Sequence, residues 1–348
     1  MKFCGKINDL ARTFIPIMSI IRSTNNNRWI YTYDYAPDEV WSEWRVSMET
    51  PAWVVSEAQA VANRIESIQS ANPLSFVLIS DNHYTVNGTC QDTRDAIAEL
   101  NKLTRLDGVI HLGDFTDGMV DRAKTTDYAT IILNGIEATG LKCYAALGNH
   151  DCNYFMNNAE QMTIYEQCRL YLKRETPRYY VDCEELRLIF IDSFDPETQL
   201  RYGFTAECIN WLNEVLNGAG QNVIIFSHVT PLVQLQAWTD EIRNSDVIMR
   251  VLNQNSRKIL AFINGHNHCD LLYNNGEFPI ISINCAKCEF FLEYKPEGAV
   301  VPYRKLGERT QESFDIMTID SDKRIIYFTR FGAGHDRIVQ NGKASWII

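Results

Sequence analysis

Short apolar runs alternate with segments of helical spacing along most of this chain. Strands are predicted at 76–79, 109–112, 143–147, 188–191, 223–226 and 259–263. Helices are predicted between several of them, at 92–103, 127–138, 159–173, 205–216 and 246–253. Such alternation is typical of sheets that are covered by helices. The pattern therefore predicts an α/β fold.

Both ends of the chain depart from this alternation. Residues 1–50 hold an aromatic cluster with period-two character near 29–35, which indicates an edge strand. We expect this segment to be an extension that either packs on the main domain or presents a surface to a substrate or partner. A helix is predicted after Pro51, because apolar residues recur at three- and four-residue steps from Val54 to Ile68.

The C-terminal part is rich in strands. They are predicted at 280–283, 314–319 and 325–328, without long helices between them. They indicate a further sheet that completes the same domain. We therefore expect residues 51–348 to form one domain, with its core motifs at 76–270 and completing strands at 280–331.

Composition narrows the function classes. Of the 348 residues, 45% are hydrophobic, enough for a sizeable core, and the formal net charge is −11. General nucleic-acid binding needs a basic surface, so no nucleic-acid groove is expected. No stretch of about 18 apolar residues predicts a membrane span, and no signal peptide is evident, so a cytoplasmic location is expected. The ten scattered cysteines indicate reduced thiols. The oligomeric state stays open.

Polar residues that can bind metal ions follow five of the predicted strands. Sites in open α/β sheets form just beyond the carboxyl ends of strands. The five blocks are Asp81-Asn82-His83, Gly113-Asp114 with Asp117, Gly148-Asn149-His150-Asp151, Ser227-His228 and Gly265-His266-Asn267-His268. One histidine after a strand is usually a packed or turn residue. Five of the seven histidines at successive strand ends indicate a shared site instead.

The ordered set Asp-x-His, Gly-Asp-x-x-Asp, Gly-Asn-His-Asp, His and Gly-His-x-His resembles the calcineurin-like metallophosphoesterase superfamily. It spans Asp81 to His268, about half of the chain. The resemblance implies a four-layer α/β/β/α sandwich of two mixed sheets flanked by helices. It also implies two metal ions. One would take Asp81, His83, Asp114 and His268, and the other Asp114, Asn149, His228 and His266.

These ligand types suit manganese, iron, zinc or cobalt better than calcium. By the same resemblance, a hydroxide bridging the metals would attack phosphorus. His150 would stabilise the transition state and protonate the leaving oxygen, and Asp117 would orient His150. A turn-capping role for Asp117 is the alternative, and Asp151 is expected to be a structural hydrogen-bonder. Asn149 and His150 would also contact the substrate.

Residues 330–337 hold two glycines, His335 and Arg337 after a predicted strand. This segment either closes the domain as a glycine-rich turn or brings His335 or Arg337 to a substrate phosphate.

The resemblance implies a dinuclear metal-dependent hydrolase of small phosphodiesters or phosphomonoesters. Gly118 and Asp151 stand where the protein phosphatases of this superfamily carry arginine and glutamate. This difference favours the broad bacterial and phage-type branches. The alternative is a non-catalytic scaffold or binding protein of the same fold. Scaffold members lose ligands, and because this chain keeps the full set, catalysis is favoured.

Overall fold

The computed structural model describes residues 18–22, 29–33, 49–84, 90–155, 158–195, 201–289 and 294–347. The chain divides into two compact units, Met1–Glu49 and Thr50–Ile348. In the first unit, β1 (Met18–Arg22) and β2 (Trp29–Tyr33) pair in antiparallel fashion. The strand predicted near the aromatic cluster is therefore confirmed. Most of the predicted extension lies outside the described residues, so its role stays a prediction.

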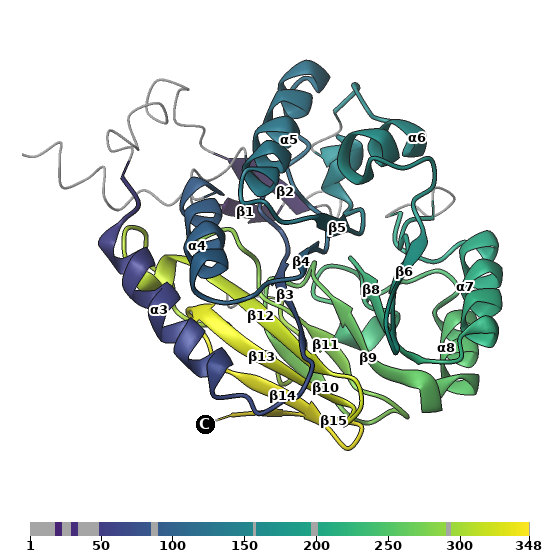
Figure 1. Cartoon of the computed structure of the whole chain (residues 1–348). Coiled ribbons are helices and arrows are strands. Elements are labelled where there is room, and N and C mark those ends of the chain that lie inside the picture. Colours follow the sequence, from purple (N-terminus) through teal and green to yellow (C-terminus); the bar gives the residue numbers. More distant parts are fainter. Residues whose placement is uncertain are drawn as a thin grey trace, which may run out of the picture. The chain divides into compact units, whose positions relative to one another are not determined.

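Two mixed sheets form the centre of the second unit (Figure 1). The first sheet has the order β15 (Lys343–Trp346), β14 (Arg337–Gln340), β13 (Ile325–Gly332), β12 (Ser313–Asp320), β3 (Leu74–Ile79), β4 (Gly108–His111) and β5 (Cys143–Ala145). The second has the order β10 (Leu271–Tyr273), β11 (Ile280–Ser282), β9 (Ile259–Asn264), β8 (Asn222–Ser227), β7 (Leu186–Phe190) and β6 (Tyr179–Cys183). The strands β3, β4 and β5 are mutually parallel, and so are β7, β8, β9 and β11.

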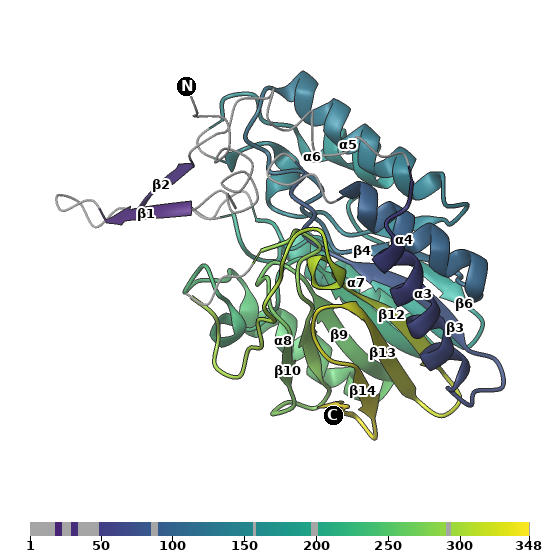
Figure 2. The ribbon, with the colours of Figure 1, turned by 90° about the vertical axis from the view of Figure 1, so that its left-hand side faces the viewer.

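Helices cover the outer faces of both sheets. They are α3 (Ala52–Glu66), α4 (Cys90–Leu103), α5 (Arg122–Glu137), α6 (Ile164–Gln167), α7 (Ala206–Gly218) and α8 (Ser245–Gln254). Figures 1 and 2 show α3, α4 and α5 on the side of the first sheet, and α7 and α8 on the side of the second. The structure is thus a four-layer α/β/β/α sandwich, which confirms the predicted fold.

Side-chain alternation along the strands explains the layers. In β3, Val77 and Ile79 pack against α3 and α4, whereas Phe76 and Leu78 face the second sheet. Consecutive side chains of a strand point to opposite faces, so a continuous apolar run serves two cores at once. A third core lies between the second sheet and the helices α7 and α8.

The C-terminal strands are placed differently from the prediction. β12 pairs with β3 in the first sheet, and β11 pairs with β9 in the second. The expected further sheet is therefore wrong: these strands complete the two sheets that already exist. The predicted helix at 159–173 begins later, because Thr163 caps α6 at Ile164, and it passes into a π-helical turn at Cys168–Leu172. Five of the described strands, β1, β6, β10, β14 and β15, were not predicted.

In the described ranges, none of the helices is long and apolar enough to cross a membrane. The nine cysteines in these ranges carry free thiols.

Candidate metal centre

The loops after β3, β4, β5, β8 and β9 converge, and they bring all seven predicted metal ligands together. Two groups form. The first contains Asp81, His83 and His268, and the second contains Asp114, His228 and His266. In each group the potential ligand atoms lie within 4.8 Å of one another. All six residues come from the strand ends that the sequence singled out.

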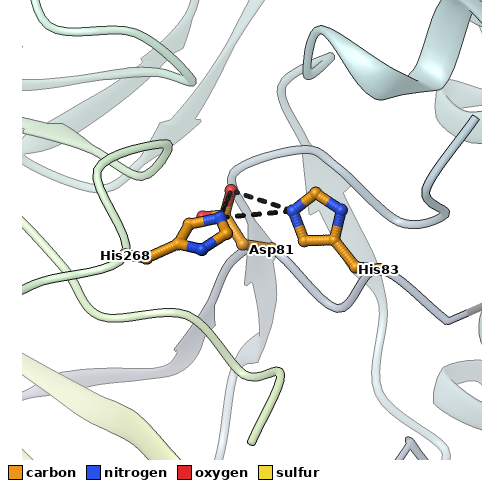
Figure 3. A group of neighbouring side chains, drawn as sticks. All are labelled: Asp81, His83 and His268. Atoms are coloured by element: carbon orange, nitrogen blue, oxygen red, sulfur yellow. Dashed lines mark hydrogen bonds and ion pairs between the residues drawn. The ribbon is translucent and has the colours of Figure 1, made fainter. Parts of the chain in front are cut away.

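The first group has two imidazoles that face one carboxylate oxygen (Figure 3). His268 Nε2 lies 3.2 Å from Asp81 Oδ1 and 3.2 Å from His83 Nε2. His83 Nε2 lies 3.8 Å from the same Asp81 oxygen. Two ring nitrogens and an oxygen that converge in this way suit a common cation.

The second group is centred on His228. Its Nε2 lies 3.1 Å from Asp114 Oδ2, 3.0 Å from Asn149 Oδ1 and 3.2 Å from His266 Nδ1. Asp114 Oδ2 also lies 3.6 Å from His83 Nε2, which belongs to the first group. One carboxylate oxygen therefore borders both groups, as a bridging ligand requires.

Backbone groups fix the orientation of the two aspartates. Asp81 Oδ2 accepts hydrogen bonds from His266 N at 3.0 Å and from Ser80 Oγ at 2.5 Å. Asp114 Oδ1 accepts from His150 N at 2.8 Å. In each case the second oxygen is left to face the histidines. Both aspartates also adopt positive φ angles of 56°, a region that only a few per cent of residues other than glycine occupy, with asparagine, aspartate and histidine the most frequent among them.

Two glycines of the motifs are needed for close approach. A Cβ on Gly148 would lie 2.1 Å from Asp114 Oδ1. A Cβ on Gly265 would lie 2.0 Å from Ser80 Oγ and 2.7 Å from Asp81 Oδ2. These positions admit only glycine without moving the aspartates.

The outer ring nitrogens determine which atom each histidine presents to the centre. His228 Nδ1 lies 2.7 Å from the Leu112 carbonyl oxygen, and His83 Nδ1 lies 2.8 Å from Asp117 Oδ1. Both rings thereby expose Nε2 as the potential ligand. His266 is reversed: its Nδ1 faces His228, and its buried Nε2 has no hydrogen-bond partner among the described residues.

The predicted role of Asp117 needs correction. Its carboxylate lies on His83, whereas His150 Nδ1 contacts the Asp117 backbone carbonyl oxygen at 2.5 Å. A carbonyl can fix the tautomer of His150 as well as a carboxylate can. His150 Nε2 is then directed to the centre and lies 4.0 Å from an Asp114 carboxylate oxygen.

Asp151 has the structural role expected of it. Its carboxylate accepts backbone hydrogen bonds from Asp114 at 3.0 Å, Phe115 at 2.9 Å and Gly148 at 2.7 Å. It thereby joins the loops after β4 and β5.

The carboxylates make this a strongly anionic environment for the histidines. Burial lowers the pKa of His83, but hydrogen bonds to Asp117 and Asp81 outweigh it and raise this pKa to about 10. Burial likewise lowers the pKa of His228, and the charges of Asp114 and Asp81 raise it to about 9. The carboxylates thus favour positive charge at these two rings.

His150 behaves differently. Burial lowers its pKa to about 4, with partial opposition from Asp114. At neutral pH it is therefore an uncharged imidazole, and its Nε2 carries a free lone pair.

The prediction for Arg337 is wrong. This side chain is fully buried, and its guanidinium contacts Asp270 Oδ1 at 2.5 Å and also the carboxylate of Asp315. Arg330 joins the same two aspartates. We call these four residues the Arg–Asp cluster. The charges of the four residues compensate one another, so the charge of Arg337 is not available to a substrate phosphate.

Residues 333–336 form the turn between β13 and β14, which is the glycine-rich turn that the sequence left open. His335 is exposed, and its ring lies against Trp346 with centroids 6.3 Å apart. Its contact with a substrate stays a prediction.

Sequence reasoning missed Glu289. This buried carboxylate contacts His268 Nδ1, and Lys287 Nζ lies 3.2 Å from its other oxygen. The signal was present, because Glu289 follows the predicted strand at 280–283 and the strand-end rule applies to it equally.

Comparison with known proteins adds to this geometry. The family described as calcineurin-like phosphoesterase matches residues 74–270. A dimetal phosphatase from Danio rerio is similar in structure, with a TM-score of 0.55 and 16% sequence identity, over 77% of this chain and 99% of that chain. A purple acid phosphatase from yellow lupin (Lupinus luteus) seeds has a TM-score of 0.49 and 13% identity, over 80% of this chain and 53% of that one. No curated protein matched the sequence. At these identities, similarity of structure shows the fold alone.

Proposed function

This chain belongs to the calcineurin-like phosphoesterase family, and on this premise we propose that it is a dinuclear metal-dependent hydrolase of small phosphoesters. Family membership supports metal-dependent phosphoester hydrolysis in general. One observation supports the dinuclear form: Asp114 Oδ2 lies 3.1 Å from His228 Nε2 and 3.6 Å from His83 Nε2. The two nitrogens belong to different groups of proposed ligands, so the oxygen lies between the two positions where cations would bind.

The donor set fits two borderline divalent ions. Imidazole nitrogens dominate, joined by two carboxylates and one amide oxygen, and manganese, iron, zinc and cobalt accept such mixed sets. One ion would be held by Asp81, His83, Asp114 and His268, and the other by Asp114, Asn149, His228 and His266. Bound metal ions neutralise phosphoryl charge and lower the pKa of water so that it can attack phosphorus.

His150 would serve the leaving group. Its Nδ1 is held by the Asp117 carbonyl, so only Nε2 faces the centre. The ring is neutral without substrate, and the negative charge of a phosphoryl group would raise its pKa. A ring protonated on Nε2 can then donate to the departing oxygen.

Aromatic rings lie beside two histidines of the proposed site. Phe155 lies 4.4 Å from the ring of His150, and Trp238 lies 6.2 Å from the ring of His268, between ring centroids. Such rings favour an ester with an organic group over inorganic phosphate alone. They do not decide between diesters and monoesters.

The test is hydrolysis after metal reconstitution. The full chain, loaded with Mn²⁺, Fe²⁺, Zn²⁺ or Co²⁺, is expected to cleave bis-p-nitrophenyl phosphate or p-nitrophenyl phosphate and to bind two ions per chain. Asp114→Asn is expected to lose metal and activity together. His150→Ala is expected to keep both metals and to lose about 10²–10⁴-fold in rate. Glu312→Gln, a buried glutamate outside the centre, is the matched control.

The same assay addresses the alternative. A non-catalytic scaffold of this fold would hydrolyse neither ester with any of the metals. That result would refute the proposed function even if the ions bind, because the complete ligand set would then be without catalytic effect.

A further inference from the structure

A segment outside the sequence motifs is fastened to the metal centre. It is the loop at 285–289, which follows β11. Ala286 N donates to the Ser80 carbonyl at 2.7 Å, and Lys287 N donates to the Asp81 carbonyl at 3.1 Å. The loop thus runs beside the turn that carries Asp81, as a further strand does at a sheet edge.

A buried arginine fixes this loop. The guanidinium of Arg304 donates to the carbonyls of Cys285 at 2.6 Å, Ala286 at 3.1 Å and Lys287 at 2.7 Å. Arg304 is 2% exposed, so its charge has been removed from water for these contacts. Desolvation of a guanidinium is costly unless its donors are satisfied. The hydrogen bonds from this buried guanidinium therefore fix the backbone conformation of the loop.

The loop delivers one carboxylate to the centre. Glu289 is 4% exposed, its Oε1 contacts His268 Nδ1, and its Oε2 lies 3.2 Å from Lys287 Nζ. The lysine balances the buried negative charge. Since Nδ1 of His268 is occupied in this way, Nε2 is the atom that faces Asp81 Oδ1 at 3.2 Å.

We propose that Glu289 is a positioning residue of the metal centre: it holds His268 in the tautomer and orientation in which Nε2 can bind the ion shared with Asp81 and His83. A carboxylate on the outer nitrogen of a histidine also makes the ligand more basic, and loss of such a partner typically weakens metal binding about 10–100-fold. This inference rests on the proposed function only for the presence of metal.

Cys285 is the competing interpretation, because its sulfur lies in a possible metal-ligating group with His268 and Glu289. Its thiol donates to the Lys287 carbonyl at 3.2 Å and lies 3.7 Å from Arg304 Nη1. A thiol that donates its proton is not a thiolate ligand. Glu289 therefore acts on His268 and does not form a further metal site with Cys285.

Metal binding by the full chain tests the proposal without reference to activity. Wild type, Glu289→Gln and Glu289→Ala are titrated with Co²⁺, and the visible absorption of bound cobalt is recorded alongside metal content. We expect one of the two ions of Glu289→Ala to bind about 10–100-fold more weakly, with a changed cobalt spectrum. Glu289→Gln should lie between, because its amide oxygen still accepts from Nδ1 but carries no charge. Glu312→Gln should match wild type.

The outcomes separate the two claims. Wild type with two ions, and both Glu289 variants with unchanged affinities and spectra, would overturn the role of Glu289 and leave the proposed function standing. Wild type that binds no metal would overturn both. If Glu289→Ala does not fold, the isosteric Glu289→Gln decides alone, with its metal-free melting temperature as the control for folding.

Discussion

Removal of one charge from the Arg–Asp cluster should destabilise the whole domain. The cluster joins the two sheets, because Asp315 and both arginines lie on β12, β13 and β14, whereas Asp270 directly precedes β10. Arg330 Nε lies 3.1 Å from Asp315 Oδ1, and Arg330 Nη2 lies 2.6 Å from Asp270 Oδ1. All four side chains are at most 2% exposed. Two positive and two negative charges therefore balance in the interior.

Asp315→Asn is the appropriate perturbation, since it keeps the shape and removes only the charge. It leaves one buried positive charge uncompensated. Breaking a buried ion pair in this way costs about 3–5 kcal/mol. At about 2–4 °C per kcal/mol for a domain of this size, the melting temperature should fall by about 6–20 °C.

The assay is urea and thermal unfolding of the metal-free protein, with Asp182→Asn as the control. Asp182 also pairs with an arginine, Arg187 at 2.6 Å, but its side chain is 45% exposed, so less than about 1 kcal/mol should be lost. Combining Asp315→Asn with Arg337→Met should restore part of the loss, because charge balance returns. If Asp315→Asn unfolds within about 1 kcal/mol of wild type, the reasoning from buried charge is refuted.

Three further predictions follow from the structure. Asp117→Asn should weaken metal binding about 10–100-fold through His83, as measured by cobalt titration, and unchanged affinity would contradict the contact described. Gly148→Ala should abolish metal binding, because its Cβ would lie 2.1 Å from Asp114 Oδ1, and metal content after dialysis checks this. Burial raises the pKa of Glu312 from 4.5 to about 7. The native state therefore keeps a proton on Glu312 that the unfolded chain has released, and this contribution to the free energy of unfolding is lost as pH rises from about 4.5 to 7. Between these pH values the free energy of unfolding should fall by about 3 kcal/mol, and Glu312→Gln should remove that fall.

The local elements were predictable because their signals are local. Short continuous apolar runs predict β3 and β4 from their own residues, and turn residues mark where they end. The strand-end rule then predicts that Asp81 and Asp114 share a site, because parallel neighbours bring their carboxyl ends to one edge. This prediction uses only the residues of each strand and the expectation that the two strands are parallel neighbours.

The side-chain contacts that were not predicted correctly involve partners that are far away in the sequence. Arg337 follows a glycine-rich segment, and that context left open both a turn that closes the domain and a loop that reaches a substrate phosphate. The structure instead pairs it with Asp270 and Asp315 through strands whose neighbours cannot be read from the sequence. Likewise, the family resemblance implied that Asp117 orients His150, but it could not tell the carboxylate from the carbonyl as the contacting atom.

Three histidines of the candidate metal centre are oriented by other groups of the protein. His228 is held by the Leu112 carbonyl and His83 by Asp117, both in the loop after β4, and His268 is held by Glu289 in the loop after β11. Each of these contacts joins two groups of the protein, so the fold itself orients the rings toward the centre. Ligands that are already oriented lose little conformational freedom on binding, and binding energy is then available for affinity.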